Sequence, residues 1–172
     1  MNKRVLIIGP SPVKSKGGMA TVTQEMLESE VLNSDFDLGV HESYRDGNLF
    51  YRILFSIYGF IKFLFIYNKY DIFHIHMAAY GSVFRKGLYV NFLKGKNKRI
   101  ILHIHGAEYL VFYNKLSENK KLKVKKIWEN ADKIIVLSEK WKQDFFKIFK
   151  LENIVVINNG INIKKLKLAI SK

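Results

Sequence analysis

The sequence predicts an α/β fold, namely a doubly wound parallel sheet of about six strands within one domain. Three observations lead to this prediction. Short β-branched runs alternate with segments of helical periodicity along the chain. Four of the six runs are almost continuously apolar, as is typical of parallel strands that are covered on both faces. The length of 172 residues suits one ordinary domain.

The expected strands are the short runs, and the first of them ends at Gly9-Pro10. They are Val5–Gly9, Phe36–His41, Asp71–His76, Arg99–His103, Lys133–Leu137 and Asn153–Ile157. Strands that alternate with helices in this way pair in parallel through right-handed crossovers. The sequence contains no internal repeat, linker or low-complexity tract that would interrupt the sheet.

The expected helices lie between the strands. They are Gly18–Val31, Leu49–Asn68, Gly81–Leu93, Ser117–Asn130 and Glu139–Phe149. In the first helix, Met19, Val22 and Met26 recur at helical spacing. In the last helix Trp141 begins an apolar stripe, and Ser138 is placed to cap the helix at its N-terminus.

Composition excludes several classes of protein. Hydrophobic residues make up 48% of the chain, which is enough to bury a core and excludes a disordered protein. The chain has no cysteine, which excludes a disulfide scaffold, a thiolate zinc site, an iron–sulfur cluster and a cysteine nucleophile. Patterns typical of nucleic-acid-binding domains are missing, so we expect no nucleic acid as partner.

Positive charge is concentrated in the second half of the chain. The formal net charge is +14, and residues 94–172 carry 19 basic against 7 acidic side chains. Such a basic half favours an anionic partner, such as a membrane surface or a phosphorylated substrate. A lysine-rich composition without any partner is the alternative explanation.

The sequence predicts a cytoplasmic protein. The apolar run near the N-terminus has five residues, too few for a signal peptide. The longest apolar stretch, Ile53–Tyr67, is interrupted by Ser56, Gly59 and Lys62 and falls short of the roughly 20 residues that span a bilayer.

The helix Leu49–Asn68 is apolar on nearly all sides, with cations and aromatic residues interspersed. It is either a crossover helix packed on the core or a helix that lies in a membrane interface. A lysine-rich helix around Lys120–Lys126 is usually a solvated surface, and it is also suited to an anionic membrane leaflet.

In a doubly wound sheet, ligands bind outside the carboxyl ends of the strands, where the strand order reverses. We therefore expect five segments to lie along one crevice. They are Gly9–Gly18, His76–Ser82, His103–Glu108, Ser138–Glu139 and Asn158–Gly160.

The connection after the first strand matches neither the GxGxxG nor the GxxxxGK[ST] pattern, so it is neither a dinucleotide fingerprint nor a Walker loop. It contains Lys14 and Lys16 and ends in Gly17-Gly18 at a helix N-terminus. Free N–H groups at such a terminus favour anions, and glycine allows a ligand to approach the backbone closely. A plain turn remains the alternative.

Two HxH pairs occur in neighbouring expected strands, His74-Ile75-His76 and His103-Ile104-His105. Residues two apart in a strand share a face, so four imidazoles can converge there. A zinc site is one interpretation, and core histidines satisfied by hydrogen bonds are the more common one. We expect His74 and His103 inside the sheet, and His76 and His105 at the crevice, where a neutral imidazole can donate a hydrogen bond to a sugar hydroxyl.

Five motifs in this order resemble the N-terminal half of a GT-B glycosyltransferase of family 4, a retaining group with a Rossmann-like sheet. The motifs are Gly17-Gly18-Met19-Ala20, Asp71–His76, His103–Glu108, Ala131–Glu139 and Val156–Ile161. The resemblance covers about residues 3–163. It implies residues 1–163 as an acceptor-side domain and residues 164–172 as the start of an interdomain linker, with the C-terminal donor-binding domain absent.

The resemblance also implies roles for single residues. The implied catalytic residue is His105, which contacts the donor sugar at the reaction centre. The donor-binding residues are Lys16, Gly17 and Gly18. The acceptor-side residues are His76, Glu108, Ser138 and Glu139, and the hinge residues are Asn159 and Gly160.

The implied function is a retaining, nucleotide-sugar-dependent hexosyltransferase of bacterial polysaccharide or glycolipid synthesis, inactive as this chain alone. Its partners are a nucleotide-sugar donor, a saccharide or lipid-linked acceptor and a separate C-terminal-domain chain, and it needs no metal or other cofactor. It lies on the cytoplasmic side, peripherally on the inner face of the membrane. The alternative is a non-catalytic subunit that recruits a split glycosyltransferase to the membrane.

Overall fold

The structure is a computed structural model that describes residues 2–15, 17–45, 47–106 and 108–158. It contains the expected doubly wound α/β fold around one parallel sheet. The strands are β1 (Lys3–Pro10), β2 (Phe36–Tyr44), β3 (Ile72–Met77), β4 (Arg99–Ile104), β5 (Lys133–Val136) and β6 (Ile154–Val156). Their order is β2-β1-β3-β4-β5-β6, and every neighbouring pair is parallel. The order therefore reverses between β1 and β3.

Seven helices and one 3-10 turn connect the strands in the described part. They are α1 (Gly18–Glu28), α2 (Glu30–Asp35), α3 (Leu49–Ile66), η1 (Tyr67–Lys69), α4 (Gly81–Lys94), α5 (Tyr109–Asn114), α6 (Glu118–Glu129) and α7 (Glu139–Phe149). The first expected helix is in fact two helices. Ser29 adopts an extended conformation and its hydroxyl accepts a hydrogen bond from the Leu32 amide, so it ends α1 and caps α2.

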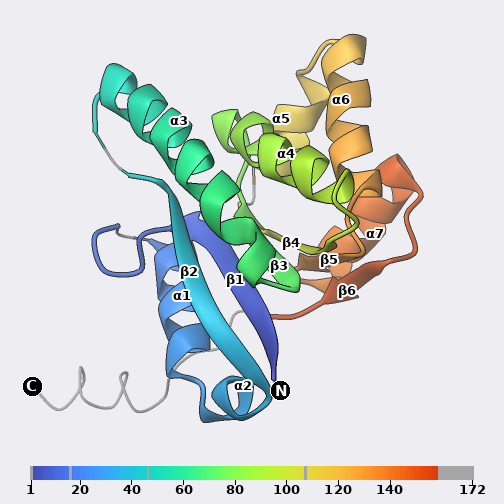
Figure 1. The fold of residues 1–172 in the computed structure, drawn as a ribbon. Helices are drawn as coiled ribbons and strands as arrows, with labels where there is room; N and C mark the ends of the chain where they lie inside the picture. Colours follow the sequence, from blue (N-terminus) through green and yellow to red (C-terminus); the bar gives the residue numbers. More distant parts are fainter. Residues whose placement is uncertain (1, 16, 46, 107, 159–172) are drawn as a thin grey trace, which may run out of the picture.

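The helices lie on both faces of the sheet, with α1 and α2 on one face and α3 to α7 on the other (Figure 1). The larger core lies beneath α3 to α7. There the ring of Trp128 stacks on Phe149, with centroids 4.3 Å apart, and the Trp128 indole N–H donates to the Tyr109 hydroxyl at 2.6 Å. Burying a large apolar side chain of this kind contributes about 1.5 to 3 kcal/mol to folding.

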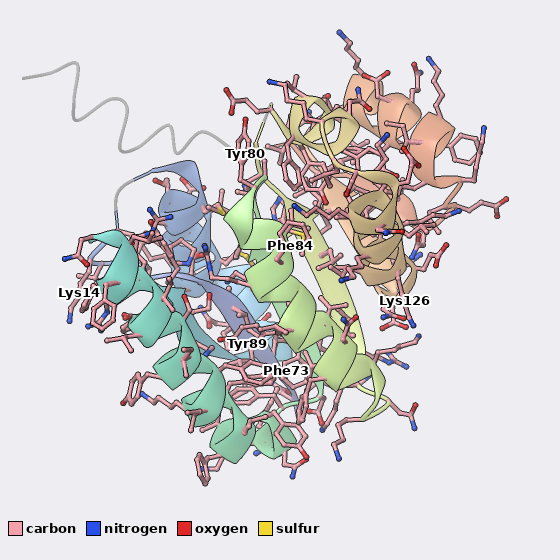
Figure 2. The ribbon with its side chains drawn as sticks, turned by 90° about the horizontal axis from the view of Figure 1, so that it is seen from above. Lys14, Phe73, Tyr80, Phe84, Tyr89 and Lys126 are labelled. Atoms are coloured by element: carbon pink, nitrogen blue, oxygen red, sulfur yellow. The ribbon has the colours of Figure 1, made fainter. Side chains whose placement is uncertain are left out.

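Side chains alternate across the sheet and thereby separate the core from the histidines. In β3, Phe73 and Ile75 belong to the core cluster, so His74 and His76 point to the face that carries α1. Figure 2 shows Phe73 and Tyr89 between α3 and α4, which lie side by side over the core face. The core face is thus buried and rich in aromatic side chains, whereas the opposite face carries imidazoles.

Two aspartates fix the amino ends of the strands. The Asp71 carboxylate accepts from the Arg4 amide at 2.9 Å, and its own amide donates to the Arg4 carbonyl. Asp132 is bonded to Ile100 in the same two ways, with the carboxylate at 2.7 Å from the amide. Each aspartate therefore continues the hydrogen bonding between neighbouring strands just before β3 or β5 begins.

Helix α3 and the following η1 occupy the range of the expected helix Leu49–Asn68, and this helical stretch extends beyond the apolar run Ile53–Tyr67. By length and composition alone, Leu49–Lys69 could cross a membrane, so the expectation that this stretch is too short is wrong. The reason is that Gly59 and Lys62 stay within one continuous helix. Gly59 and Phe63 pack against the molecule, whereas Phe65 is 80% exposed. Helix α3 therefore has one buried stripe and a broad exposed apolar face.

Candidate active site

A hollow of about 300 Å³ lies at the carboxyl ends of β1 and β3, where the strand order reverses. Open parallel sheets bind their ligands in this position. Its polar lining combines cations, hydroxyls and one imidazole, and we call it the carboxyl-end hollow. These lining residues are Arg52, His76, Tyr80, Ser82, Arg85 and Lys86.

A larger hollow of about 550 Å³ lies at the opposite edge, around the amino ends of β1, β3 and β4. It is lined by residues such as Arg4, Asp71 and Arg99. Volume alone would favour this second hollow. We place the site at the carboxyl-end hollow because the strand order reverses there and because Asp71 is already bonded to the neighbouring strand.

The four histidines in β3, in β4 and directly after β4 form two hydrogen-bonded pairs on one face of the sheet. His76 Nδ1 and His105 Nε2 are 2.8 Å apart, and His74 Nε2 and His103 Nδ1 are 3.2 Å apart. All four are buried. His76 lines the carboxyl-end hollow, and the hydrogen bond joins His105 to it. His74 and His103 line a separate hollow on the side of α1.

Burial keeps the imidazoles uncharged at neutral pH. It lowers the pKa of His74 and of His105 to about 4, and it lowers the pKa of His76 well below the usual value. A neutral imidazole offers one donor and one acceptor, which suits the observed pairing. The Nε2 atoms of His76 and His103 are buried without a hydrogen-bond partner among the described residues.

The spacing of His76 and His105 suits a hydrogen bond better than two ligands of one metal. One nitrogen from each of His74, His76 and His103 lies within 4.8 Å of the others. Two ligands of one tetrahedral zinc lie about 3.3 Å apart, given zinc–nitrogen bonds of about 2.0 to 2.1 Å. The 2.8 Å separation of His76 and His105 is shorter than that and is an ordinary hydrogen-bond distance.

A buried lysine lies at the base of the carboxyl-end hollow. Lys86 is 3% exposed, and its ammonium group donates to the Ser43 hydroxyl and to the Ile8 carbonyl. Burial, with a smaller effect of Arg85, lowers the pKa of Lys86 to about 7. Our sequence reasoning did not identify this residue. A signal was present, because Lys86 lies three and four residues from Val83 and Val90 in the buried stripe of α4.

The glycine pair lies at the start of α1 beside the hollow. Gly17 has a φ of 120°, which favours glycine over other residues, and nothing lies within 4 Å of where its Cβ would be. The next residues lead to Met19, which lines the carboxyl-end hollow. Lys16, the third expected donor-binding residue, lies outside the described residues.

Tyr80 and Glu108 meet at the rim of the hollow. Tyr80 has a φ of 58° immediately before α4, a strained conformation for a residue with a side chain. Its hydroxyl donates to the Glu108 carboxylate at 3.1 Å. Figure 2 shows Tyr80 at the N-terminal end of α4. The structure therefore brings Glu108 next to the hollow that His76 lines.

The structure does not bring the remaining expected residues into this hollow. The Ser138 hydroxyl accepts from the Trp141 amide at 3.2 Å and so caps α7, as the sequence predicts. Glu139 lines a different hollow beside α7 and β6. Asn159 and Gly160, the expected hinge, lie outside the described residues.

Comparison with known proteins agrees with the fold. The model of the family described as Glycosyltransferase Family 4 matches residues 17–165. This range includes the glycine pair, both histidine strands and the cap of α7. A search among curated proteins gives no match. Because the family model covers most of the chain, the chain belongs to Glycosyltransferase Family 4.

Proposed function

We propose that residues 1–163 form the acceptor-side half of a retaining, nucleotide-sugar-dependent hexosyltransferase of bacterial polysaccharide or glycolipid synthesis. Membership of Glycosyltransferase Family 4 makes the chain a glycosyltransferase domain. The observation that carries the finer proposal is the cation-lined hollow at the carboxyl ends of β1 and β3. It combines a buried imidazole with positive charge at the position where open sheets bind ligands.

In this proposal, His105 contacts the donor sugar and His76 holds it in place. Sugar transfer passes through a positively charged sugar while a diphosphate departs. A neutral imidazole pair can orient a sugar hydroxyl without adding positive charge beside that transition state. The proposal assigns Gly17, Gly18 and Lys16 to donor binding, because free amides at the start of α1 favour phosphate oxygens.

Glu108 is the acceptor-side residue that the geometry supports best, because Tyr80 holds its carboxylate at the rim of the carboxyl-end hollow. Ser138 and Glu139 remain acceptor-side predictions. Both lie at the start of α7, and reaching the acceptor from there would require a substrate that extends across β4 and β5.

We propose that a second wall completes the site, supplied by a C-terminal donor-binding domain that is reached through residues 164–172 or carried by a separate chain, with Asn159 and Gly160 as the hinge. The carboxyl-end hollow is open on one side, and sugar transfer requires a closed site that excludes water. In this proposal protein cations on the second wall take up the diphosphate charge, so the reaction needs no metal and no other cofactor.

The proposal is tested by joining the chain to a C-terminal domain of the same family and measuring nucleoside diphosphate release from a panel of UDP- and GDP-sugars. We expect release to require this chain and to fall about 100-fold or more in His105→Ala, because the sugar loses its positioning. Lys126→Gln, on the exposed side of α6, is the matched control and should release at the unmodified rate. Equal rates for His105→Ala and the unmodified chain would contradict the proposal.

A second candidate function is supported by helix α3. In this alternative the chain is a non-catalytic subunit that recruits a split glycosyltransferase to the cytoplasmic face of the membrane. Phe50 and Phe65 are 72% and 80% exposed on α3, as in a helix that lies in a membrane interface. The lysines of α6 would add attraction to anionic lipids. Vesicle binding by a joined protein that lacks transfer would favour this alternative, whereas transfer would favour the first.

A further inference from the structure

The carboxyl-end hollow meets a second, apolar groove. This groove has a volume of about 330 Å³ and lies between α3 and α4, which run side by side (Figure 2). Its apolar lining comprises Leu49, Ile53, Ile57, Phe60, Ile61 and Leu88. Arg52 and Arg85 line both the groove and the carboxyl-end hollow, so two guanidinium groups lie where the apolar and polar spaces meet.

Arg52 and Arg85 are half-buried, and neither forms an ion pair with a carboxylate of the described residues. The Nε atoms of Arg52 and Arg85 are buried and make no hydrogen bond within the described ranges. The ion pairs found among the described residues involve other cations. Both guanidinium groups instead lie over the ring of Tyr44, at 5.3 Å and 4.9 Å from its centroid. The ring contacts both groups by cation–π interaction, and the two Nε donors remain without a partner among the described residues.

Positive charge accumulates here, and the ion pairs among the described residues do not neutralise it. Burial lowers the pKa of Arg85, and the charge of Arg52 lowers it further. Lys86 adds a third cation at the base of the same hollow. Like charges at a half-buried position are unfavourable unless an anion joins them, and the planar fork of arginine matches phosphate oxygens.

We propose that the arginine junction binds the phosphate of a lipid-linked acceptor, with the lipid chain in the α3–α4 groove and the saccharide toward His76. This inference rests on the proposed function and names the class of its acceptor. A saccharide alone would not use the apolar groove or the two cations. A free phosphate would not use the groove. One molecule that carries an apolar chain, a phosphate and a sugar in that order occupies all three parts.

The exposed face of α3 supports the same orientation. Ile53, Ile57 and Ile61 line the groove and are each about half exposed, so the groove opens onto the apolar surface of the helix. A lipid whose tail stays in a bilayer beneath α3 can place its phosphate at Arg52 and Arg85 by entering along this groove. The membrane contact and the acceptor site would then be one continuous surface.

The test measures binding of a soluble prenyl diphosphate, geranylgeranyl diphosphate, to the full chain by calorimetry below the concentration at which the ligand forms micelles. We expect it to bind at least about tenfold more tightly than inorganic diphosphate or geranylgeraniol, since each of these lacks one half of the ligand. Arg52→Gln and Arg85→Gln should each weaken binding about tenfold. Arg99→Gln, an exposed arginine at the opposite edge of the sheet, is the matched control and should bind like the unmodified chain.

A groove variant separates the two halves of the site. Leu88→Asn should weaken binding of geranylgeranyl diphosphate about tenfold and leave the affinity for inorganic diphosphate unchanged, because Leu88 lines only the apolar part. Leu88 is more than half exposed, so this variant should fold, and its urea unfolding curve verifies this. Equal affinities of all variants for the prenyl diphosphate would overturn the inference.

Two further results distinguish this inference from the proposed function. If phosphatidylglycerol vesicles compete as well as geranylgeranyl diphosphate at equal phosphate concentration, the arginines bind a bulk lipid surface and the acceptor site is disproved. If the joined enzyme releases nucleoside diphosphate while the chain binds no prenyl diphosphate, only the inference fails. If the chain binds the prenyl diphosphate and the joined enzyme never releases nucleoside diphosphate, the inferred site stands and the proposed function fails.

Discussion

His74 and His105 are buried imidazoles, and their burial predicts an acid-sensitive fold. Their pKa values are about 4 in the folded chain and about 6.5 in the unfolded chain. As the pH falls below 6.5 the unfolded chain takes up protons first, so the free energy of unfolding decreases until about pH 4. We expect a loss of about 1.4 kcal/mol per pH unit for each histidine that stays neutral in the fold.

Urea unfolding at pH 7.5, 6 and 5 measures this slope. His74→Asn should reduce the slope because it removes one of the titrating groups. Aspartate and glutamate titrate mostly below this window, so they contribute little to the difference between pH 7.5 and pH 6. The same free energy of unfolding at pH 7.5 and at pH 5 would show that the histidines are not buried as described.

The paired histidines also predict indifference to zinc. One nitrogen of each histidine is already in a hydrogen bond of 2.8 or 3.2 Å to another imidazole, and these bonds fix the orientation of the rings. We therefore expect the thermal midpoint to stay within about 1 °C when zinc or a chelator is added, because a ligand that binds the folded state would raise it. A zinc-dependent rise that His103→Asn abolishes would instead establish a metal site.

Single residues differ in how far the sequence reveals them. The four histidines were predictable as neighbours because a strand places residues two apart on one face. Arg52 and Arg85 were not, since they lie 33 positions apart on separate helices and only the packing of α3 against α4 brings them together. Lys86 was visible as a cation in an apolar stripe, but its partners Ser43 in β2 and Ile8 in β1 are far from it in sequence.

Among the elements, the start of β5 depends on one aspartate. The Asp132 carboxylate accepts from the Ile100 amide at 2.7 Å, so Asp132→Ala leaves that amide without its partner. We expect a loss of about 1 to 3 kcal/mol in the free energy of unfolding, measured in urea. Asp37→Ala on the exposed side of β2 is the matched control and should change stability by less than about 0.5 kcal/mol. Equal losses for both variants would contradict this role.

The two sides of α3 predict opposite outcomes for two phenylalanines. Phe63 is fully buried and contacts Phe73 and Tyr89, so Phe63→Ala should cost about 3 to 5 kcal/mol of unfolding free energy. Phe65 is 80% exposed, so Phe65→Ser should leave stability nearly unchanged while it lowers co-sedimentation with vesicles. Full vesicle binding by Phe65→Ser would place the membrane contact elsewhere.

The elements themselves were largely predictable, because hydrophobic period and strand–helix alternation depend on local sequence. The exceptions are short. Helix α5 has six residues and buries Tyr109, Phe112 and Tyr113, and so brief an apolar run carries no clear period. The break between α1 and α2 depends on the cap at Ser29, and hydrophobic periodicity does not reveal such a cap.

At the scale of the molecule, the proposals use three surfaces that adjoin one another. In the proposed function the carboxyl-end hollow holds the reacting groups. The α3–α4 groove leads away from it, and the exposed side of α3 continues that groove. The fold class followed from the sequence because alternation determines a parallel sheet. The contact between the carboxyl-end hollow and the α3–α4 groove did not follow from the sequence, since it depends on how α3 and α4 pack on the sheet.

The most direct test of the account is hydrogen–deuterium exchange of the chain joined to a C-terminal domain of its family, with and without a nucleotide sugar that the joined enzyme cleaves. The account predicts slower exchange in the segments that follow β1 and β3, including Ala78–Ser82 beside the carboxyl-end hollow. Slower exchange confined to the opposite edge, around Arg4 and Asn97–Arg99 in the larger hollow, would contradict it.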